Sequence, residues 1–199
     1  MVLPKPTTSL NALQNITLRR LDHAPNAEAP ASPSTIASDT LWQTKPVLLF
    51  IVRRPGCVFC REEALSLASN RATIENQWGV QMVAVVHEEL GALEFQQEFW
   101  KGPLYLDADK ATFKALGQGQ LRWCSSLNIV NPTVFAHGAR ANRKGVKGNF
   151  KGEGRILGGL YVVKAGEGGV VYEYKEKIFG DHAPIDQVLE ACQTAAGQL

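Results

Sequence analysis

Hydrophobic positions along the chain fall into short continuous runs that are separated by segments of mixed polarity. Residues 46–52 and 80–86 are almost entirely apolar, which is typical of strands buried on both faces of a parallel or mixed sheet. A shorter run at 103–107 is also predicted to be a strand. The alternation of such runs with helix-forming segments indicates an α/β fold with right-handed crossover connections. The predicted helices between and after these strands cover 57–68, 88–100 and 108–116.

The C-terminal part of the chain has the pattern of a β-hairpin followed by a helix. Residues 159–164 and 170–174 have the residue types of strands, and the turn between them has the sequence Gly166-Glu-Gly-Gly169. A final helix is predicted over 186–196, with a proline near its first turn. Residues 117–155 show neither pattern, are rich in glycine, and carry seven basic residues against one acidic residue. We interpret this stretch as an insertion before the hairpin.

Residues 1–44 differ in composition from the rest of the chain. Three prolines, at positions 25, 30 and 33, lie among Ala, Ser and Thr. We expect this N-terminal extension to be partly ordered or to lie over the core. Because the whole chain has 199 residues, we expect 45–199 to form a single domain.

Composition and charge argue against several classes of protein. Hydrophobic residues make up 45% and charged residues 20% of the chain, as in ordinary globular proteins rather than disordered or fibrous ones. The net charge of +2 gives no reason to expect a nucleic-acid partner, which usually requires a concentrated basic excess. The longest apolar run, 46–52, is far shorter than the roughly 20 residues of a membrane-spanning helix. The N-terminus lacks the pattern of a secretory signal, so we expect a cytoplasmic protein.

Two of the four cysteines, Cys57 and Cys60, form a Cys-x-x-Cys pair soon after the strand predicted at 46–52. Such a pair is a redox dithiol, half of a zinc site, or two inert residues. A structural zinc site needs four ligands, and the other cysteines and the four histidines are scattered along the chain. Strand, breaker, dithiol and helix in succession therefore favour the redox interpretation, with no metal.

The setting of the pair predicts a reactive thiolate. Free backbone N–H groups at a helix N-terminus lower the pKa of a nearby thiol, and Arg53, Arg54 and Arg61 add positive charge. Cys57 is expected to attack, because it lies at the exposed start of the helix. Cys60 is expected to resolve, because it lies one turn further in and is better shielded. The reverse order stays open.

Several segments outside and around the pair carry a resemblance to a known family. They are Arg53-Arg-Pro-Gly-Cys-Val-Phe-Cys-Arg-Glu-Glu-Ala64, Leu104-Tyr-Leu-Asp107, the glycine-rich segment 148–163, Phe179-Gly-Asp181 and Val188-Leu-Glu-Ala191. Together they resemble the peroxiredoxin-like 2 family, which includes relatives of selenoprotein U and prostamide/prostaglandin F synthase. The resemblance extends over about residues 45 to 195.

The resemblance implies a thioredoxin-like fold of the peroxiredoxin superfamily, with a mixed central sheet flanked by helices. It also implies an antioxidant thiol oxidoreductase in which Cys57 and Cys60 reduce peroxides or lipid endoperoxides through a dithiol–disulfide cycle. No cofactor is bound in that case, and an external donor such as thioredoxin with NADPH reduces the disulfide. The alternative is a redox-sensing or disulfide-exchange module without small-molecule turnover.

Two positions depart from better-known relatives. Typical peroxiredoxins have the motif Pro-x-x-x-Thr-x-x-Cys. If Cys60 is aligned with the cysteine of this motif, Cys57 occupies the place of the threonine and Arg53 that of the proline. Thioredoxins have a cis-proline just before the hairpin strand, where this chain has Gly158 and Gly159. These differences favour a specialised reductase over a general disulfide exchanger.

Further candidate residues each have a plainer alternative. Arg155 is a candidate for stabilising the thiolate or binding a substrate carboxylate, or else it is a surface arginine. The basic stretch 140–155 either steers anions toward the site or is a solvated loop. Glu63, one turn after the pair, either relays a proton or serves the helix dipole. His87 is interpreted as a loop histidine, and Cys124 as an inert packing residue.

Overall fold

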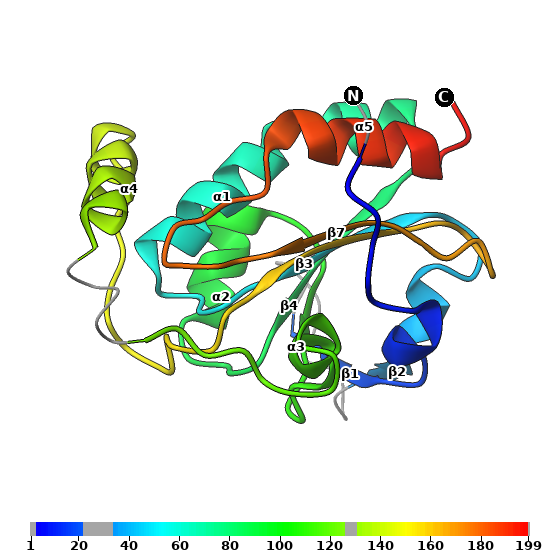
Figure 1. The fold of residues 1–199 in the computed structure, drawn as a ribbon, viewed down its shortest axis with the longest axis horizontal. Coiled ribbons are helices and arrows are strands. Elements are labelled where there is room, and N and C mark those ends of the chain that lie inside the picture. Colours follow the sequence, from blue (N-terminus) through cyan, green and yellow to red (C-terminus); the bar gives the residue numbers. More distant parts are fainter. Residues whose placement is uncertain (1–2, 22–33, 126–130, 199) are drawn as a thin grey trace.

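A seven-stranded mixed sheet forms the centre of the computed structural model, which describes residues 3–21, 34–125 and 131–198 (Figure 1). The strands are β1 Thr17–Arg20, β2 Thr35–Ala37, β3 Val47–Ile51, β4 Gln81–Val86, β5 Leu104–Leu106, β6 Gly159–Val163 and β7 Val170–Lys175. Their order across the sheet is β2-β1-β5-β4-β3-β6-β7. β3, β4 and β5 pair in parallel, and the remaining neighbours pair antiparallel. The α/β prediction with a mixed sheet is confirmed.

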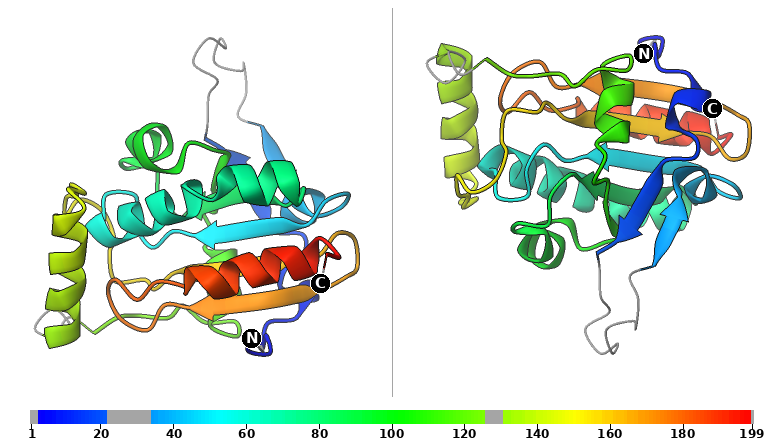
Figure 2. Two further views of the ribbon diagram at one scale, coloured as in Figure 1. Left: turned by 90° about the horizontal axis from the view of Figure 1, so that it is seen from above. Right: turned by 90° about the horizontal axis from the view of Figure 1, so that it is seen from below.

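Helices cover both faces of this sheet (Figure 2). They are η1 Leu10–Leu13, η2 Ser38–Leu41, α1 Val58–Ala68, η3 Ala72–Gln77, α2 Ala92–Glu94, η4 Phe95–Trp100, α3 Ala111–Leu116, α4 Pro132–Arg143 and α5 Ile185–Ala195. Side chains of β3 alternate between the two faces, as in any strand. Leu48 and Phe50 pack with α1 and α5, while Leu49 and Ile51 pack with α3 and the N-terminal segment. Burial on both faces explains why this strand is apolar throughout.

The predicted hairpin and last helix are also confirmed, but two predicted helices begin later than the pattern suggested. The helix expected from residue 88 begins at Ala92, because Gly91 before it has a left-handed conformation with φ of 77°. The helix expected from residue 108 begins at Ala111. The Asp107 carboxylate accepts the N–H groups of Ala111 and Thr112 at 3.0 and 2.7 Å and so defines the helix start.

The insertion 117–155, for which the sequence predicts no regular structure, contains the helix α4. Asn131 caps its N-terminus, since the Asn131 side-chain oxygen accepts the N–H of Thr133 at 2.9 Å, and Pro132 follows at the first helical position. This Asn-Pro start is a signal that the sequence carries. α4 stands at the end of the molecule where α1 begins (Figure 1).

The segment before residue 45 contributes two strands to the sheet. β1 pairs antiparallel with β5 and β2, so these strands extend one edge of the sheet. The predicted separation into an extension and a domain stays a prediction, although its first part is joined to the sheet through β1. No helix in the described ranges is long and apolar enough to cross a membrane.

Candidate active site

The cysteine pair lies where β3 leads into α1. β3 ends at Ile51, and Cys57 is the N-cap residue of α1. The Cys57 N–H donates to the Arg54 carbonyl oxygen at 3.1 Å, and the Arg61 N–H donates to the Cys57 carbonyl oxygen at 3.0 Å. The Cys57 side chain therefore stands at the helix start, where the first backbone N–H groups have no partner within the helix.

Arg53 is the charged group that contacts the Cys57 sulfur. Its Nη2 donates to Cys57 Sγ at 2.8 Å, and the arginine is only 3% exposed. Its Nε donates to Glu176 Oε1 at 3.2 Å, and its Nη1 donates to the Gly154 carbonyl oxygen at 2.7 Å. The ring of Phe179 lies 4.6 Å from Arg53 Cζ. Because these contacts hold the guanidinium on several sides, it stays directed at the sulfur in a buried setting.

Two other buried residues, His87 and Glu176, contact Arg53. His87 Nε2 lies 2.9 Å from the Arg53 carbonyl oxygen, and the His87 ring meets the Phe113 ring edge-on. Glu176 also accepts the N–H of Gly158 at 3.0 Å. Burial raises the pKa of the Glu176 carboxyl, although the Arg53 charge opposes this shift. His87, expected to be a loop histidine, is thus a buried residue that contacts the site.

The two thiols have opposite pKa shifts. Burial by itself raises the pKa of Cys57, but the Cys60 thiol, the Arg53 charge and nearby backbone N–H groups together hold it well below the ordinary range. The pKa of Cys60 lies well above its ordinary value because of its hydrogen bond to Cys57 and its burial. Cys57 therefore carries the thiolate and Cys60 the proton, which supports Cys57 as the attacking thiol.

The expectation that Cys57 lies exposed and Cys60 shielded is wrong. Both thiols are free, and their residues are buried to a similar degree, with exposures of 3% and 5%. Residues 145–154, which we call the strap, lie over the start of α1. The Asn149 N–H donates to the Gly56 carbonyl oxygen at 2.7 Å, and a Cβ at Gly148 would lie 2.6 Å from the Val58 nitrogen. Charge, rather than exposure, therefore distinguishes the two cysteines.

Arg54 and Arg61 hold the strap in place. Arg54 Nη2 donates to the Asn149 carbonyl oxygen at 2.7 Å, and Arg61 Nη1 donates to the Lys147 carbonyl oxygen at 3.0 Å. Arg61 also bonds to the Pro55 carbonyl oxygen, at 2.9 Å. These two predicted site residues thus position the walls of the site, whereas Arg53 contacts the sulfur.

Arg155 lies apart from this cluster. Its side chain is exposed and its guanidinium lies 5.9 Å from the centre of the Trp123 ring. This placement agrees with the plainer alternative of a surface arginine.

A second acidic group lies beside the pair on α1. Glu63, half-buried one turn after Cys60, accepts the N–H of Ala183 at 3.1 Å. Burial raises the pKa of Glu63 to about 8, and the negative charges of Glu176 and Asp181 add to this shift. The raised pKa favours the protonated form of Glu63 near neutral pH, as a residue that relays a proton would need.

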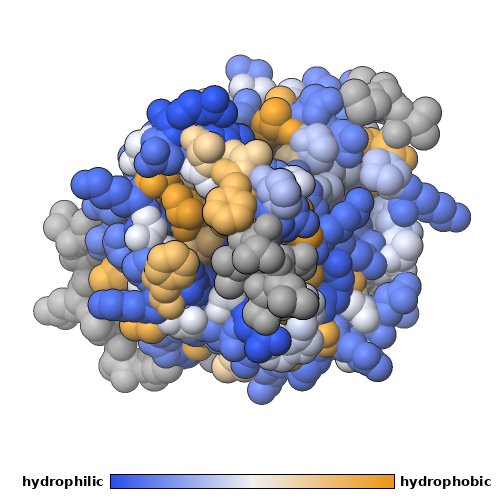
Figure 3. All heavy atoms as spheres, turned by 60° about the vertical axis from the view of Figure 1, so that its left-hand side comes forward, coloured by the Kyte–Doolittle hydropathy of each residue, from blue (hydrophilic) through white to orange (hydrophobic). Residues whose placement is uncertain are grey.

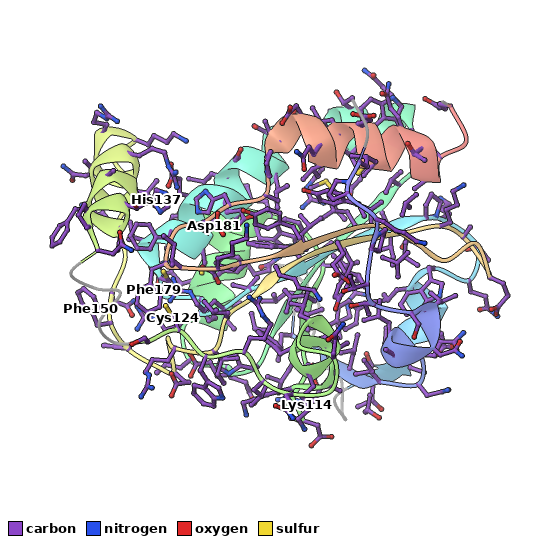
Figure 4. All side chains as sticks on the ribbon, viewed as in Figure 1. Lys114, Cys124, His137, Phe150, Phe179 and Asp181 are labelled. Atoms are coloured by element: carbon purple, nitrogen blue, oxygen red, sulfur yellow. The ribbon has the colours of Figure 1, made fainter. Side chains whose placement is uncertain are left out.

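The helix α4 is attached to α1 through a buried carboxylate. Glu62 accepts Arg140 Nε at 2.9 Å and pairs with Lys144 Nζ at 2.9 Å. Burial works against ionisation of Glu62, but these hydrogen bonds keep its pKa below the ordinary value. Beneath α4, Cys124 packs in a small apolar cluster with Phe179, at the end of the sheet where α1 begins (Figure 4).

Several of these contacts join residues too far apart in sequence for any spacing rule to connect them. Glu176 and Phe179 lie more than 120 positions after Arg53 in the chain. In the parts of the chain that the structure describes, no group of three or more His, Cys, Asp or Glu residues is arranged to hold a metal ion.

Comparisons with known proteins agree with this architecture. Residues 66–177 match the family model described as AhpC/TSA antioxidant enzyme. The matched segment starts after both cysteines of the pair, so it does not bear on them.

Two relatives and one solved structure are similar over most of the chain. Peroxiredoxin-like 2A of Xenopus tropicalis is 37% identical over 87% of this chain and 76% of that protein. Peroxiredoxin-like 2A of Homo sapiens is 35% identical over 96% of this chain and 79% of that protein. The structure of the Xanthomonas campestris bacterioferritin comigratory protein, described for alkyl peroxide reduction, has a TM-score of 0.58 at 15% identity and covers 98% of both chains. This likeness shows a peroxiredoxin-type, thioredoxin-like fold.

Proposed function

Because the chain belongs to the peroxiredoxin-like 2 family of AhpC/TSA antioxidant enzymes, we propose that it is a thiol-dependent oxidoreductase that reduces peroxides or lipid endoperoxides. The dithiol of Cys57 and Cys60 is the proposed redox centre. The 2.8 Å contact between Arg53 and the Cys57 sulfur carries this proposal, since a buried cation at the sulfur favours the thiolate form of Cys57.

In the first step, the Cys57 thiolate attacks one oxygen of the peroxide bond. A sulfur–oxygen bond forms, the oxygen–oxygen bond breaks, and its electron pair goes to the leaving oxygen, which takes a proton from solvent to become an alcohol, or water when the substrate is hydrogen peroxide. A hydroperoxide converts Cys57 to a sulfenic acid, whereas an endoperoxide leaves a sulfenate ester of the opened substrate. Arg53, already at the sulfur, stabilises the negative charge as it moves to oxygen.

In the second step, Cys60 attacks the oxidised Cys57 sulfur. Cys60 loses its proton, a disulfide forms, and the oxygen leaves as water from the sulfenic acid or as an alcohol from the ester. The high pKa of Cys60 keeps it protonated, and so unreactive, until Cys57 has been oxidised. An external dithiol donor, for which we propose a thioredoxin-like protein supplied by NADPH, then returns the disulfide to the dithiol. The cytoplasmic location stays a prediction.

The test is a coupled assay of NADPH oxidation with thioredoxin and its reductase. Hydrogen peroxide, an alkyl hydroperoxide and a lipid endoperoxide serve as substrates. We expect turnover with at least one of them, and we expect Cys57→Ser to abolish it. Cys60→Ser is expected to stop after one equivalent of peroxide. Cys192→Ser is the matched control, because Cys192 lies on the buried face of α5 and outside the pair, and it is expected to keep turnover. Full activity of Cys57→Ser would refute the assignment.

The burial of both thiols favours a second candidate function, a redox sensor without small-molecule turnover. Exposures of 3% and 5% mean that some of the surrounding structure must move before a bulky molecule reaches the sulfurs. A sensor predicts negligible turnover with the whole substrate panel and mixed disulfides with proteins that accumulate in Cys60→Ser. The same panel therefore separates the two functions.

A further inference from the structure

Large apolar side chains stand exposed around the strap. Phe150, within the strap, is 96% exposed, and Leu90 and Leu93 are each about half exposed. A Cβ at Gly91 would lie 3.8 Å from Pro55 Cβ, so the segment with the two leucines lies against the same connection that the strap covers. Single exposed apolar residues are ordinary, but an almost fully exposed phenylalanine beside a segment with two more exposed apolar side chains is a candidate interaction surface.

The strap exposes these side chains because its backbone is used by the site. Carbonyl oxygens of Lys147, Asn149 and Gly154 accept hydrogen bonds from the three arginines that surround the pair. The backbone is thereby turned inward. The side chains of Lys147, Phe150 and Lys151 are exposed to solvent, and Figure 4 shows Phe150 at the outer end of the molecule beside the foot of α4.

Positive charge is concentrated in the same region. Residues 140–155 contain six basic residues and one acidic residue, whereas the rest of the chain contains 15 basic and 18 acidic residues. Arg140 and Lys144 pair with Glu62. Arg143, Lys147 and Lys151 are exposed on either side of Phe150 in the sequence. A chain of net charge +2 thus has one basic region and an otherwise acidic remainder.

Two carboxylates near the strap point to its backbone. Glu153 Oε1 accepts the N–H of Arg155 at 2.6 Å, and Glu88 Oε2 accepts the N–H of Glu153 at 3.2 Å. Glu88 therefore engages the C-terminal part of the strap, and Glu153 engages the backbone directly after it. Within three positions of Phe150 in the sequence, the exposed charged residues are Lys147, Lys151 and Glu153, so the two lysines outnumber the one acid.

We propose that the strap docks on the surface of an anionic lipid bilayer, with Phe150 entering the interface and Lys147 and Lys151 contacting lipid phosphates and carboxylates. An exposed aromatic residue among lysines suits an anionic bilayer, since basic side chains are attracted to anionic headgroups and an aromatic ring enters the membrane interface. A protein partner fits less well, because the cores of protein interfaces are poor in lysine. Apolar patches bordered by hydrophilic residues appear on the face drawn in Figure 3. This docking does not depend on the redox chemistry proposed above.

Co-sedimentation of the full chain with vesicles tests the proposal. Wild-type protein is expected to bind vesicles of phosphatidylcholine with about one-third phosphatidylserine at least tenfold more tightly than vesicles of phosphatidylcholine alone, with binding that weakens as salt is raised. Phe150→Ser is expected to lower binding about tenfold. The double change Lys147→Glu and Lys151→Glu is expected to lower it about 30-fold or more.

A matched control changes the same charges at the opposite end of the sheet. Lys45 and Lys164 lie at that end, beside the start of β3 and the end of β6, and reversing both is expected to leave binding within about twofold. Circular dichroism checks that every variant is folded. As a second measurement, Phe150→Trp is expected to add fluorescence that shifts to the blue and is quenched by brominated lipids.

Three results would overturn the docking proposal. They are equal binding to neutral and anionic vesicles, equal binding of folded Phe150→Ser, and an equal loss in the control at positions 45 and 164. Failure of the peroxide assay leaves these measurements unaffected, so the two proposals fail separately.

Discussion

Replacing Arg53 by methionine is expected to raise the pKa of Cys57, because it removes the guanidinium that donates to the sulfur at 2.8 Å. A hydrogen bond to a charged group contributes about 1.5 to 3 kcal/mol. At 1.36 kcal/mol for each pKa unit, losing it raises the pKa by about 1 to 2 units. Because the native pKa is depressed, the thiolate is expected to persist to a lower pH in the wild type than in the variant.

The assay is the rate of Cys57 alkylation by iodoacetamide as a function of pH, with the modified peptide identified by mass spectrometry. The midpoint in Arg53→Met is expected to lie about 1 to 2 pH units above that of the wild type. Arg155→Met is the control, since Arg155 lies over Trp123, and it is expected to leave the midpoint in place.

Loss of Arg53 also leaves the Glu176 carboxylate buried without its cation, which is a risk to folding. The double variant Arg53→Met with Glu176→Gln removes that charge and keeps the test available if the single variant fails to fold. A midpoint that stays unchanged in the folded double variant, or that moves equally in Arg155→Met, would show that Arg53 does not set the thiolate.

Three further changes test other parts of the site. Glu63→Gln is expected to raise the free energy of unfolding by about 1 to 3 kcal/mol at pH 7 and to have little effect on it at pH 4. The reason is that a carboxyl whose pKa is raised to about 8 costs stability only where the unfolded chain is ionised. Urea unfolding measures this, and a loss of stability at pH 7 contradicts it. Glu62→Gln is expected to weaken the attachment of α4 and to speed amide exchange over 132–143. Acidification of the wild type is expected to do the same, because a carboxyl with a lowered pKa adds stability above its unfolded-state pKa, and this stability is lost as pH falls through the folded-state pKa. Unchanged amide exchange speaks against this role. Gly148→Ala is expected to displace the strap and to speed Cys57 alkylation, since the new Cβ would lie 2.6 Å from the backbone nitrogen of Val58. Gly138→Ala is the control, because a Cβ at position 138 has no atom within 4 Å.

Local sequence patterns are enough to predict the framework of this protein. Runs of apolar residues identify β3 and β4, because a strand buried on both faces must be apolar at every position. The pair at 57 and 60 was placed at a helix start by its neighbours alone, and the structure places Cys57 at the N-cap of α1. These features depend on residues that lie close together in the chain.

The arrangement of charges around the thiols depends on contacts between segments that are distant in the chain. Three arginines flank the pair in sequence, but Glu176 and the carbonyl oxygen of Gly154 orient Arg53 toward the sulfur, and both come from over 100 residues away. The strap, which follows Cys57 by about 90 positions, packs against Gly56 and Val58 on either side of Cys57, and the two cysteines are buried to a similar degree. Hydrophobic periodicity indicates which face of a helix or strand is buried. Contacts between distant segments depend instead on how those faces pack against one another. The chemistry of the Cys57 thiol depends on such contacts.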